Sequence, residues 1–438
     1  MNQHYSRLAA LIAVVVVTGC TRPAEEPVSI GYGPKPTLPA PDSSLLPTVN
    51  IATAVGWAPG QLPTPAPGLV VQAFAGELDH PRWLYVLPNG DVLVAETNAP
   101  ARPQDATGIR GFFQKRVMKK AGAATPSANR ISILRDADGD GVAEIKQTFL
   151  SGLNSPFGMA LVGDTLFVAN SDAIVAFTHT QGALSIAAPG ATLTTLPAGP
   201  RNYHWTKNLV ASADGTRLYA TVGSNSNIGE NGLDAETGRA AIWEVEIATG
   251  DKRIFASGLR NPVGMDFEPH SGTLWTVVNE RDELGNNLVP DYATSVNDGD
   301  FFGWPWSYFG ANVDLRVAPP RPDMVARARA PDYGLGSHTA SLGLTFARGS
   351  NLGQVFRSGM FIGQHGSWNR KPRSGYKVVF VPFAAGRPAG DPVDVLTGFL
   401  DGDNALGRPV GVAFAHDGAL LVADDVGNIV WRVARARQ

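Results

Sequence analysis

Hydrophobic and polar residues alternate in a pattern that recurs six times along the chain. Each repeat is a short apolar segment with glycine, followed by a turn and a second apolar strand. The six segments are Trp83–Glu96, Gly158–Asn170, Leu209–Gly223, Gly264–Glu280, Gly359–Gly366 and Gly411–Asp425. Several of the turns contain Asn-Gly or Asp-Gly, which favour tight β-hairpins. The pattern predicts six antiparallel hairpins.

The spacing of the repeats indicates how the hairpins are assembled. Anchor positions in the second strands lie 52 to 86 residues apart: Leu93, Phe167, Tyr219, Trp275, Phe361 and Leu421. Units of this size, each with a few strands, are typical of propeller blades. The irregular spacing indicates inserted loops, which often carry function on a rigid scaffold. We therefore predict an all-β fold, a six-bladed β-propeller with inserted loops.

The hairpins also predict where polar side chains gather. In an antiparallel hairpin, residues before the first strand and residues after the second strand lie at the same edge. Those before the first strands are Arg82, Asn154, His204, Arg260, Asn261, His338 and Arg408. Those after the second strands are Glu96, Asn170, Asn225, Glu280, His365, Asp424 and Asp425. We expect these side chains to surround one mouth of the central channel.

The N-terminus has the composition of a secretion signal. Residues 1–19 contain Arg7 and then an apolar run that is too short to span a bilayer. Val17–Cys20 resembles a bacterial lipobox, in which the cysteine is lipidated. An ordinary signal peptide or an uncleaved anchor is the alternative. Residue Thr21 after the cysteine favours the outer membrane, so we expect a lipid-anchored, periplasm-facing protein.

Composition divides the rest of the chain and excludes one class of partner. Residues 20–67 are rich in proline and polar residues, which predicts a tether, and residues 68–438 form the predicted propeller domain. The formal net charge is −3, so bulk electrostatics do not favour nucleic acid as a partner. The membrane is expected to be contacted only through the N-terminal lipid.

Several segments together resemble one enzyme family. They are NYHWTKNL (Asn202–Leu209), ASGLRNPVGMDFEP (Ala256–Pro269), NERDELGNNLVPDY (Asn279–Tyr292), GQHGSWNRKPRSGYKVVFVPF (Gly363–Phe383) and LGRPVGVAF (Leu406–Phe414). In this order they resemble the quinoprotein sugar dehydrogenases, specifically the sorbosone dehydrogenase-like branch. The resemblance implies a six-bladed propeller that holds pyrroloquinoline quinone (PQQ) at the channel mouth together with Ca²⁺.

The resemblance also implies roles for individual residues. His204 matches the general base, and Arg260 with Asn261 matches the pair beside the reactive quinone carbonyl. Arg408 matches an arginine that binds a PQQ carboxylate. Further candidate cofactor contacts are Lys377, His365 and Arg281. Imidazole is a suitable base near neutral pH, and guanidinium groups match the carboxylates of PQQ. His204 as a capped strand-edge residue, and Lys377 on a solvated face, are the structural alternatives.

Two groups of acidic residues are candidate calcium ligands. Glu280 and Asp282 stand where related enzymes place the calcium beside PQQ, but the Gly-Pro pair used there is absent. Asp136, Asp138 and Asp140 follow the first positions of an EF-hand loop, although Gln147 occupies the place of the bidentate glutamate. The second group predicts a structural calcium, and a plain acidic turn is the alternative.

The expected function is PQQ- and Ca²⁺-dependent oxidation of an aldose or related sugar by hydride transfer to the quinone. The expected partners are a sugar substrate and an electron acceptor such as a cytochrome or a quinone. One alternative is a calcium-dependent lactonase, whose cage would use Glu96, Asn170, Asn225 and Glu280. Another is a non-catalytic binding propeller of the cell envelope.

Overall fold

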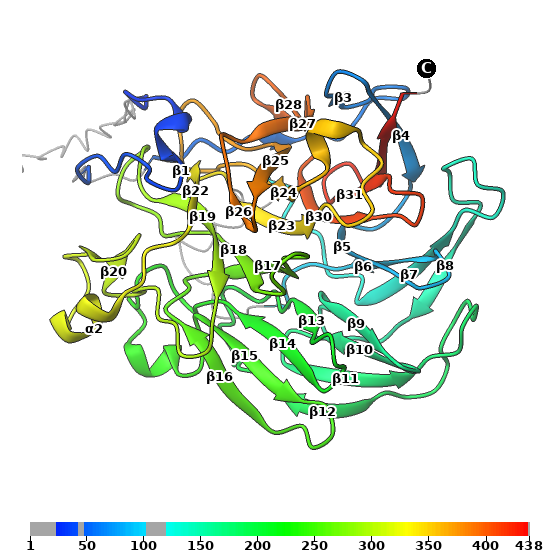
Figure 1. Cartoon of the computed structure of the whole chain (residues 1–438), viewed down its shortest axis with the longest axis horizontal. Coiled ribbons are helices and arrows are strands. Elements are labelled where there is room, and N and C mark those ends of the chain that lie inside the picture. The colour runs from blue at the N-terminus through cyan, green and yellow to red at the C-terminus, as the bar shows by residue number, and fades with distance from the viewer. Residues whose placement is uncertain (1–22, 43–47, 102–119, 437–438) are drawn as a thin grey trace, which may run out of the picture.

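The computed structural model describes residues 23–42, 48–101 and 120–436. Six antiparallel sheets are arranged as blades around a central axis (Figure 1). The predicted all-β, six-bladed propeller is confirmed. The predicted signal peptide, residues 1–19, and the candidate lipidation site Cys20 lie outside the described residues.

Each blade is built outward from the strand that lines the central channel. Blade 1 contains β5 (Pro81–Val86), β6 (Val92–Glu96), β7 (Arg130–Arg135) and β8 (Ile145–Leu150). Blade 2 contains β9 (Met159–Val162), β10 (Thr165–Ala169), β11 (Ala173–Thr178) and β12 (Ala191–Thr195). Blade 3 contains β13 (Leu209–Ala211), β14 (Arg217–Val222), β15 (Ala241–Glu246) and β16 (Lys252–Ser257).

The remaining blades recruit strands from distant parts of the chain. Blade 4 contains β17 (Pro262–Phe267), β18 (Leu274–Val278), β19 (Pro290–Val296), β22 (Tyr333–Ser337) and β1 (Tyr32–Gly33). Blade 5 contains β23 (Ser341–Phe346), β24 (Gly359–Gln364), β25 (Lys377–Ala384), β27 (Val393–Thr397) and β3 (Thr64–Pro65), with β26 (Arg387–Pro388) beside β25. Blade 6 contains β30 (Pro409–Phe414), β31 (Leu420–Asp424), β32 (Ile429–Arg435) and β4 (Leu69–Ala75).

Short elements outside the blades decorate the edges. They are β2 (Thr53–Ala54), β20 (Ser307–Tyr308), β21 (Asn312–Val313), β28 (Leu400–Asp401), β29 (Asn404–Ala405), α2 (Pro322–Arg327) and the 3₁₀ turns η1 (Val28–Gly31), η3 (Leu233–Glu236) and η4 (Gln354–Phe356). In the part of the chain that the structure describes, no helix is long and apolar enough to cross a membrane.

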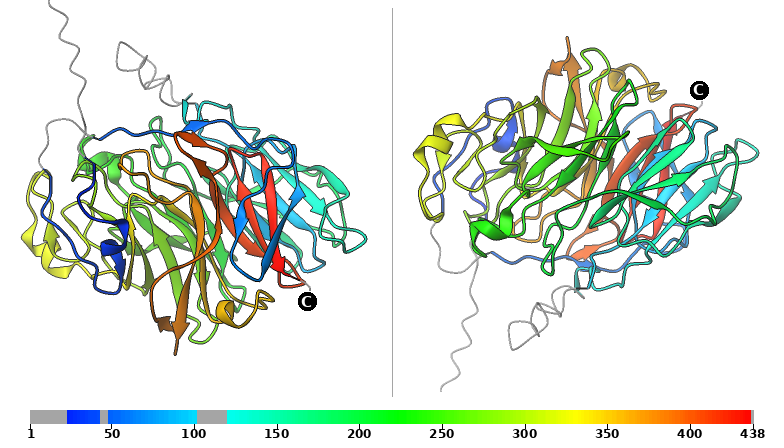
Figure 2. Two further views of the ribbon diagram at one scale, coloured as in Figure 1. Left: turned by 90° about the horizontal axis from the view of Figure 1, so that it is seen from above. Right: turned by 90° about the horizontal axis from the view of Figure 1, so that it is seen from below.

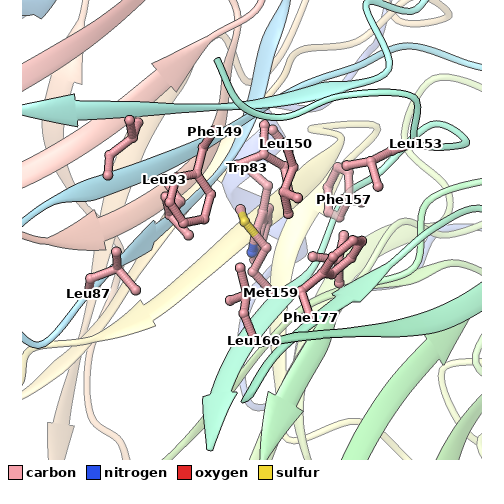
Figure 3. Packing of buried hydrophobic residues seen from close by; sticks show 14 of the residues in the cluster. Trp83, Leu87, Leu93, Phe149, Leu150, Leu153, Phe157, Met159, Leu166 and Phe177 are labelled. Atoms are coloured by element: carbon pink, nitrogen blue, oxygen red, sulfur yellow. The ribbon is translucent and has the colours of Figure 1, made fainter. Parts of the chain in front are cut away.

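The second strand of each blade is buried on both faces because a neighbouring blade covers each side. All residues of β6, β18 and β31 are buried. Between blades 1 and 2, side chains from both sheets pack against one another around Trp83, Phe157 and Met159 (Figure 3). The apolar alternation of the sequence therefore becomes a set of inter-blade cores.

The ring is closed by strands from opposite ends of the domain. β4 precedes blade 1 in the sequence, yet it pairs with β32 as the outer strand of blade 6, with Val71 opposite Val433. This pairing covers the edge of β32, so that β4 becomes the outer strand of blade 6. It also fixes blade 1 beside blade 6.

The segment between residues 23 and 67 differs from the predicted tether. Its strands β1 and β3 add to the outer edges of blades 4 and 5, and the dark-blue residues lie against the yellow elements in Figure 2. Trp57 Nε1 donates to Asp424 Oδ2 at 2.7 Å, and Ile51 and Ala52 are buried. The described part of the segment thus belongs to the folded domain. Proline-rich composition suggested a tether because extended edge strands have the same composition.

Deleting residues 1–67 is therefore expected to destabilise the domain, whereas deleting residues 1–22 is not. The longer deletion removes two edge strands and leaves Asp424 without Trp57. We expect the melting temperature to fall by roughly 5 °C or more, since each kcal/mol shifts it by about 2 °C in a large domain. Calorimetry of the two truncations measures this. Equal melting temperatures would contradict the integrated role of the segment.

Candidate active site

The mouth of the channel, where the inner strands begin, collects charged side chains from different blades. Arg82 Nη1 of blade 1 donates to Asp425 Oδ2 of blade 6 at 2.6 Å. His365 Nε2 of blade 5 lies 2.9 Å from the same oxygen. Arg260 Nη2 donates to Asp282 Oδ2 at 3.0 Å. The structure thus brings together residues that are distant in the sequence, and ion pairs already join several of them.

His204 lies just before β13 and is held by the residues that follow β14. Its Nδ1 is 2.8 Å from the carbonyl oxygen of Ser224, and its backbone N–H donates to that oxygen at 3.3 Å. A carbonyl oxygen only accepts, so Nδ1 carries the proton of the neutral imidazole and the lone pair is on Nε2. His204 therefore has the tautomer that a base acting through Nε2 requires.

Gly223 allows His204 and Asn261 to approach each other. A Cβ at Gly223 would collide with Asn261 Oδ1 and with His204 Cβ. The next backbone N–H, that of Ser224, donates to the carbonyl oxygen of Arg260 at 2.7 Å. One short backbone segment thus positions the candidate base next to the Arg260–Asn261 pair.

Several buried polar atoms at the mouth have no hydrogen-bond partner among the described residues. They are Nε and Nη2 of Arg408, Nε of Arg82 and Oδ1 of Asn261. Arg408 is only 5% exposed, and its guanidinium carbon lies 5.1 Å from the ring centroid of Tyr376. A buried donor without a partner costs about 1–3 kcal/mol, and more when it is charged. This pattern fits a site that a ligand with carboxylates and hydroxyls completes.

Arg260 is a fully engaged, buried cation. Its Nη1 donates to the carbonyl oxygen of Glu280 at 2.7 Å, and its Nη2 also donates to Asn227 Oδ1 at 2.9 Å. Burial acts to raise the pKa of Asp282, but Arg260 and then His338 outweigh it, so the pKa of this carboxyl lies below its usual value. Asp282 is consequently ionised and fixes the orientation of the guanidinium.

A second cluster surrounds Asp425 on the opposite side of the mouth. Arg82 and His365 contact its carboxylate, and His80 Nε2 lies 3.6 Å away. Burial acts to raise the pKa of Asp425, but His365, His80 and Arg82 hold it well below the usual range. Sequence reasoning missed His80. Its position two residues before Arg82, at the same hairpin edge, was the available signal.

Two predicted cofactor contacts are hydrogen-bonded to acidic residues. Arg281 is fully buried, and its three guanidinium nitrogens bind Glu280, Asp314 and the carbonyl oxygens of the loop 305–307. Lys377 Nζ instead donates to Asp394 Oδ1 at 2.6 Å, on the outer strand β27. Arg281 braces an insertion, and Lys377 lies on the third strand of its blade. That either residue contacts the cofactor stays a prediction.

The mouth carboxylates predicted to bind calcium are each paired with an arginine. Glu280 Oε2 accepts from Arg281 Nε at 2.9 Å, while Asp282 accepts from Arg260. Among the described residues, the only group of three or more acidic or histidine side chains with ligand atoms within 4.8 Å of one another is elsewhere, at the β7–β8 turn. A calcium site at Glu280 and Asp282 therefore stays a prediction.

The β7–β8 turn brings together four carboxylates: Asp136, Asp138, Asp140 and Glu144. Glu144 was not among the ligands predicted from the sequence. Gln147 occupies the twelfth loop position, and its Nε2 donates to the carbonyl oxygen of Leu184 at 2.7 Å. Backbone N–H groups already donate to Asp136 and Glu144. The predicted cluster of aspartates is present, and its occupation by calcium stays a prediction.

Comparison with known proteins places the chain in a family. Residues 127–298 and 323–436 match the sequence profile of the TrAA12-like family. The chain belongs to this family. A "Pyrroloquinoline quinone-dependent pyranose dehydrogenase" from Coprinopsis cinerea is 29% identical over 308 residues, which cover 55% of this chain and 41% of that protein. The chain spans less than two thirds of the length of the curated relatives it matches first.

Solved structures share the fold of this chain. The holo PQQ domain of the Coprinopsis cinerea pyranose dehydrogenase aligns with a TM-score of 0.67 at 21% identity, covering 88% of this chain and 100% of that one. The calcium structure of the Trichoderma reesei family AA12 enzyme aligns with a TM-score of 0.68 at 18% identity, covering 90% and 100%. At these identities the likeness shows the propeller fold.

The pH dependence of stability should report on His365. Burial lowers the pKa of His365 to about 4, although Asp425 acts in the opposite direction. Between about pH 6.5 and 4 the unfolded chain binds a proton that the folded protein does not, so stability falls as the pH falls. His365→Gln should flatten this slope by on the order of 1 kcal/mol per pH unit. Urea unfolding from pH 7 to 4 measures it, with His416→Gln, at an exposed turn, as the control. If the free energy of unfolding of His365→Gln and of wild type changed in parallel with pH, the lowered pKa of His365 would be refuted.

Proposed function

We propose that the protein is a PQQ- and calcium-dependent sugar dehydrogenase that oxidises an aldose or a related, sorbosone-like sugar. The observation that carries the proposal is the set of buried, unpartnered polar atoms of Arg408 and Asn261. Asn261 lies across Gly223 from His204, whose Nδ1 is hydrogen-bonded as in a base that acts through Nε2. Membership of the TrAA12-like family and the relationship to the Coprinopsis cinerea pyranose dehydrogenase support it.

The residues at the mouth fit the chemistry of PQQ. The cofactor has three carboxylates and therefore needs buried cations with unused donors. Arg408 has two such nitrogens and Arg82 has one. Charge-assisted hydrogen bonds from guanidinium to carboxylate are about twice as strong as neutral ones. Arg408 is thus the principal candidate to hold a carboxylate, and the Tyr376 ring supports its guanidinium from one face.

His204 is proposed to remove the proton of the reacting hydroxyl. Its Nε2 lone pair is fixed by the bond from Nδ1 to Ser224, and the imidazolium formed keeps the same hydrogen bond. Bound PQQ would supply the oxidising quinone that accepts the hydride. Asn261 Oδ1, across Gly223 from His204, can accept from a sugar hydroxyl and so orient the sugar.

Arg260 is proposed to act through its charge rather than through an unused donor. All of its guanidinium nitrogens already have partners. A fixed cation in a buried site stabilises negative charge that develops nearby without reorganising during the reaction. The dependence on calcium is supported by the calcium structure of the Trichoderma reesei relative. The calcium ligands in this chain stay a prediction.

The residues that a lactonase would use to hold calcium are partly engaged elsewhere, which disfavours this alternative. Glu96 accepts from Arg130 Nε at 3.0 Å and Nη2 at 2.6 Å, and also from Ser132 Oγ. Glu280 is bound to Arg281. Two of the four groups that would hold a catalytic calcium are therefore committed to arginines. A lactonase also gives no reason for the unpartnered donors of Arg408.

The envelope location is part of the proposal. Cys20 would carry a lipid that holds the protein at the periplasmic side of the outer membrane, and a cytochrome or a quinone would accept the electrons. The lipobox-like sequence supports this reading. Cys20→Ser should move the protein from the membrane to the soluble fraction. Retention on membranes after a salt wash would rule out the lipid anchor.

His204→Gln and Arg408→Ala should affect different quantities, the first turnover and the second PQQ binding. His204→Gln should lower kcat by about 10²–10⁴-fold, the usual contribution of a general base, while PQQ affinity stays near wild type. Arg408→Ala should weaken PQQ binding by about 2 kcal/mol or more, the value of hydrogen bonds to a charged group.

The measurements are the PQQ dissociation constant by fluorescence titration and the turnover at saturating PQQ with a dye acceptor. Lys252→Ala, on β16, the outer strand of blade 3, is the control and should leave both quantities unchanged. Full turnover of His204→Gln at saturating PQQ would show that His204 is not the base.

A further inference from the structure

A cavity of about 440 Å³ opens beside the candidate active site. Its walls come from four parts of the chain: the loop after β18, the loop after β24, the insertion that contains β20 and β21, and Pro41, Asp42 and Thr48 of the N-terminal segment. The residues used below include Glu283, Tyr308, Leu315, Arg316, Trp368 and Asn369. None of His204, Arg260, Asn261 or Arg408 lines it, so it is separate from the place where the proposed reaction occurs.

The cavity and the active site share one wall. Asn369, which lines the cavity, donates from Nδ2 to Asp282 Oδ1 at 2.7 Å. The other oxygen of Asp282 accepts from Arg260. Two hydrogen bonds therefore connect the cavity wall to the cation beside the candidate base. A ligand in the cavity would therefore lie against the residues that fix Arg260.

The apolar part of the wall is open to solvent. The Trp368 side chain is 39% exposed and Leu315 is 92% exposed. Large apolar side chains at this exposure in a concave site mark a binding surface more often than a structural one. The face of an indole packs well against the C–H face of a pyranose ring, and its ring edge remains available for polar contacts.

The polar part of the wall is rigid and has no excess positive charge. Arg316 donates to both oxygens of Asp314 and to the carbonyl oxygens of Asp282 and Glu283. Its charge is thus neutralised, and it fixes the loop that presents Glu283. Glu283 has a left-handed backbone with φ of 70°, and the bonds from Arg316 to the carbonyl oxygens of Asp282 and Glu283 hold this turn. The wall has three carboxylates, those of Asp42, Glu283 and Asp314, and one arginine, which disfavours an anion and leaves acceptors for the hydroxyl groups of a polyol.

We propose that this cavity is a subsite for a second, neutral sugar unit, so that the enzyme acts on an oligosaccharide whose reacting unit lies at His204. The inference rests on the proposed sugar dehydrogenase function. Trp368 provides the stacking platform, Glu283 accepts hydroxyl hydrogen bonds, and Asn369 marks the boundary between the two units.

The test compares mono-, di- and trisaccharides of the gluco, galacto and manno series on the enzyme loaded with PQQ and Ca²⁺. At least one di- or trisaccharide should have a kcat/KM at least tenfold above its monosaccharide. Trp368→Ala should remove that advantage through KM and leave the monosaccharide kcat/KM within twofold of wild type. Trp306→Ala is the matched control, because its indole donates to Pro319 outside the cavity.

A binding measurement separates this inference from the proposed function. Calorimetric titration of the protein without PQQ, using the same trisaccharides, should show binding that Trp368→Ala and Glu283→Gln weaken and His204→Gln does not. Binding without any oxidation would support the subsite and contradict the dehydrogenase. Oxidation with no dependence on chain length, together with unaltered binding by Trp368→Ala, would overturn the subsite and leave the dehydrogenase in place.

Discussion

The pairing of β4 with β32 is the constraint on which the rest of the molecule depends. It closes the ring by joining the first and last strands of the propeller. The same junction sets blade 1 against blade 6, where Arg82 and His80 meet Asp425. Closing the ring therefore also assembles this half of the mouth, because Arg82 and His80 are far in sequence from Asp425 and meet it only when blade 1 lies beside blade 6.

The mouth is built at a cost in stability, which indicates what it is for. Arg408 and Asn261 are buried with polar atoms that no described residue satisfies, and an apolar lining would avoid that penalty. By contrast, Arg281 and Glu96 are equally buried but fully paired, and they brace loops. The distinction between paired and unpaired buried charge separates candidate ligand-binding residues from structural ones.

Much of the fold and part of the site could be predicted from the sequence, because hairpins are local. The alternation at Trp83–Glu96 and its equivalents fixes strand positions, and the period-two pattern fixes which ends meet at the mouth. The ion-pair partner of a charged side chain is not determined by the neighbouring sequence. Arg281 could not be assigned until Asp314 was seen to approach from an insertion, and Lys377 could not be assigned without Asp394. The segment before residue 67 was misread because its edge strands have no alternation of their own.

The central claim is that the unpartnered groups at the mouth hold an oxidising quinone over a basic histidine. The most direct measurement is the absorbance of PQQ bound to the purified protein with Ca²⁺, followed after sugar is added without an external electron acceptor. The account predicts a stoichiometric shift from the quinone to the quinol spectrum, which His204→Gln slows. Stoichiometric PQQ binding with no spectral change for any aldose, or no binding at all, would contradict it.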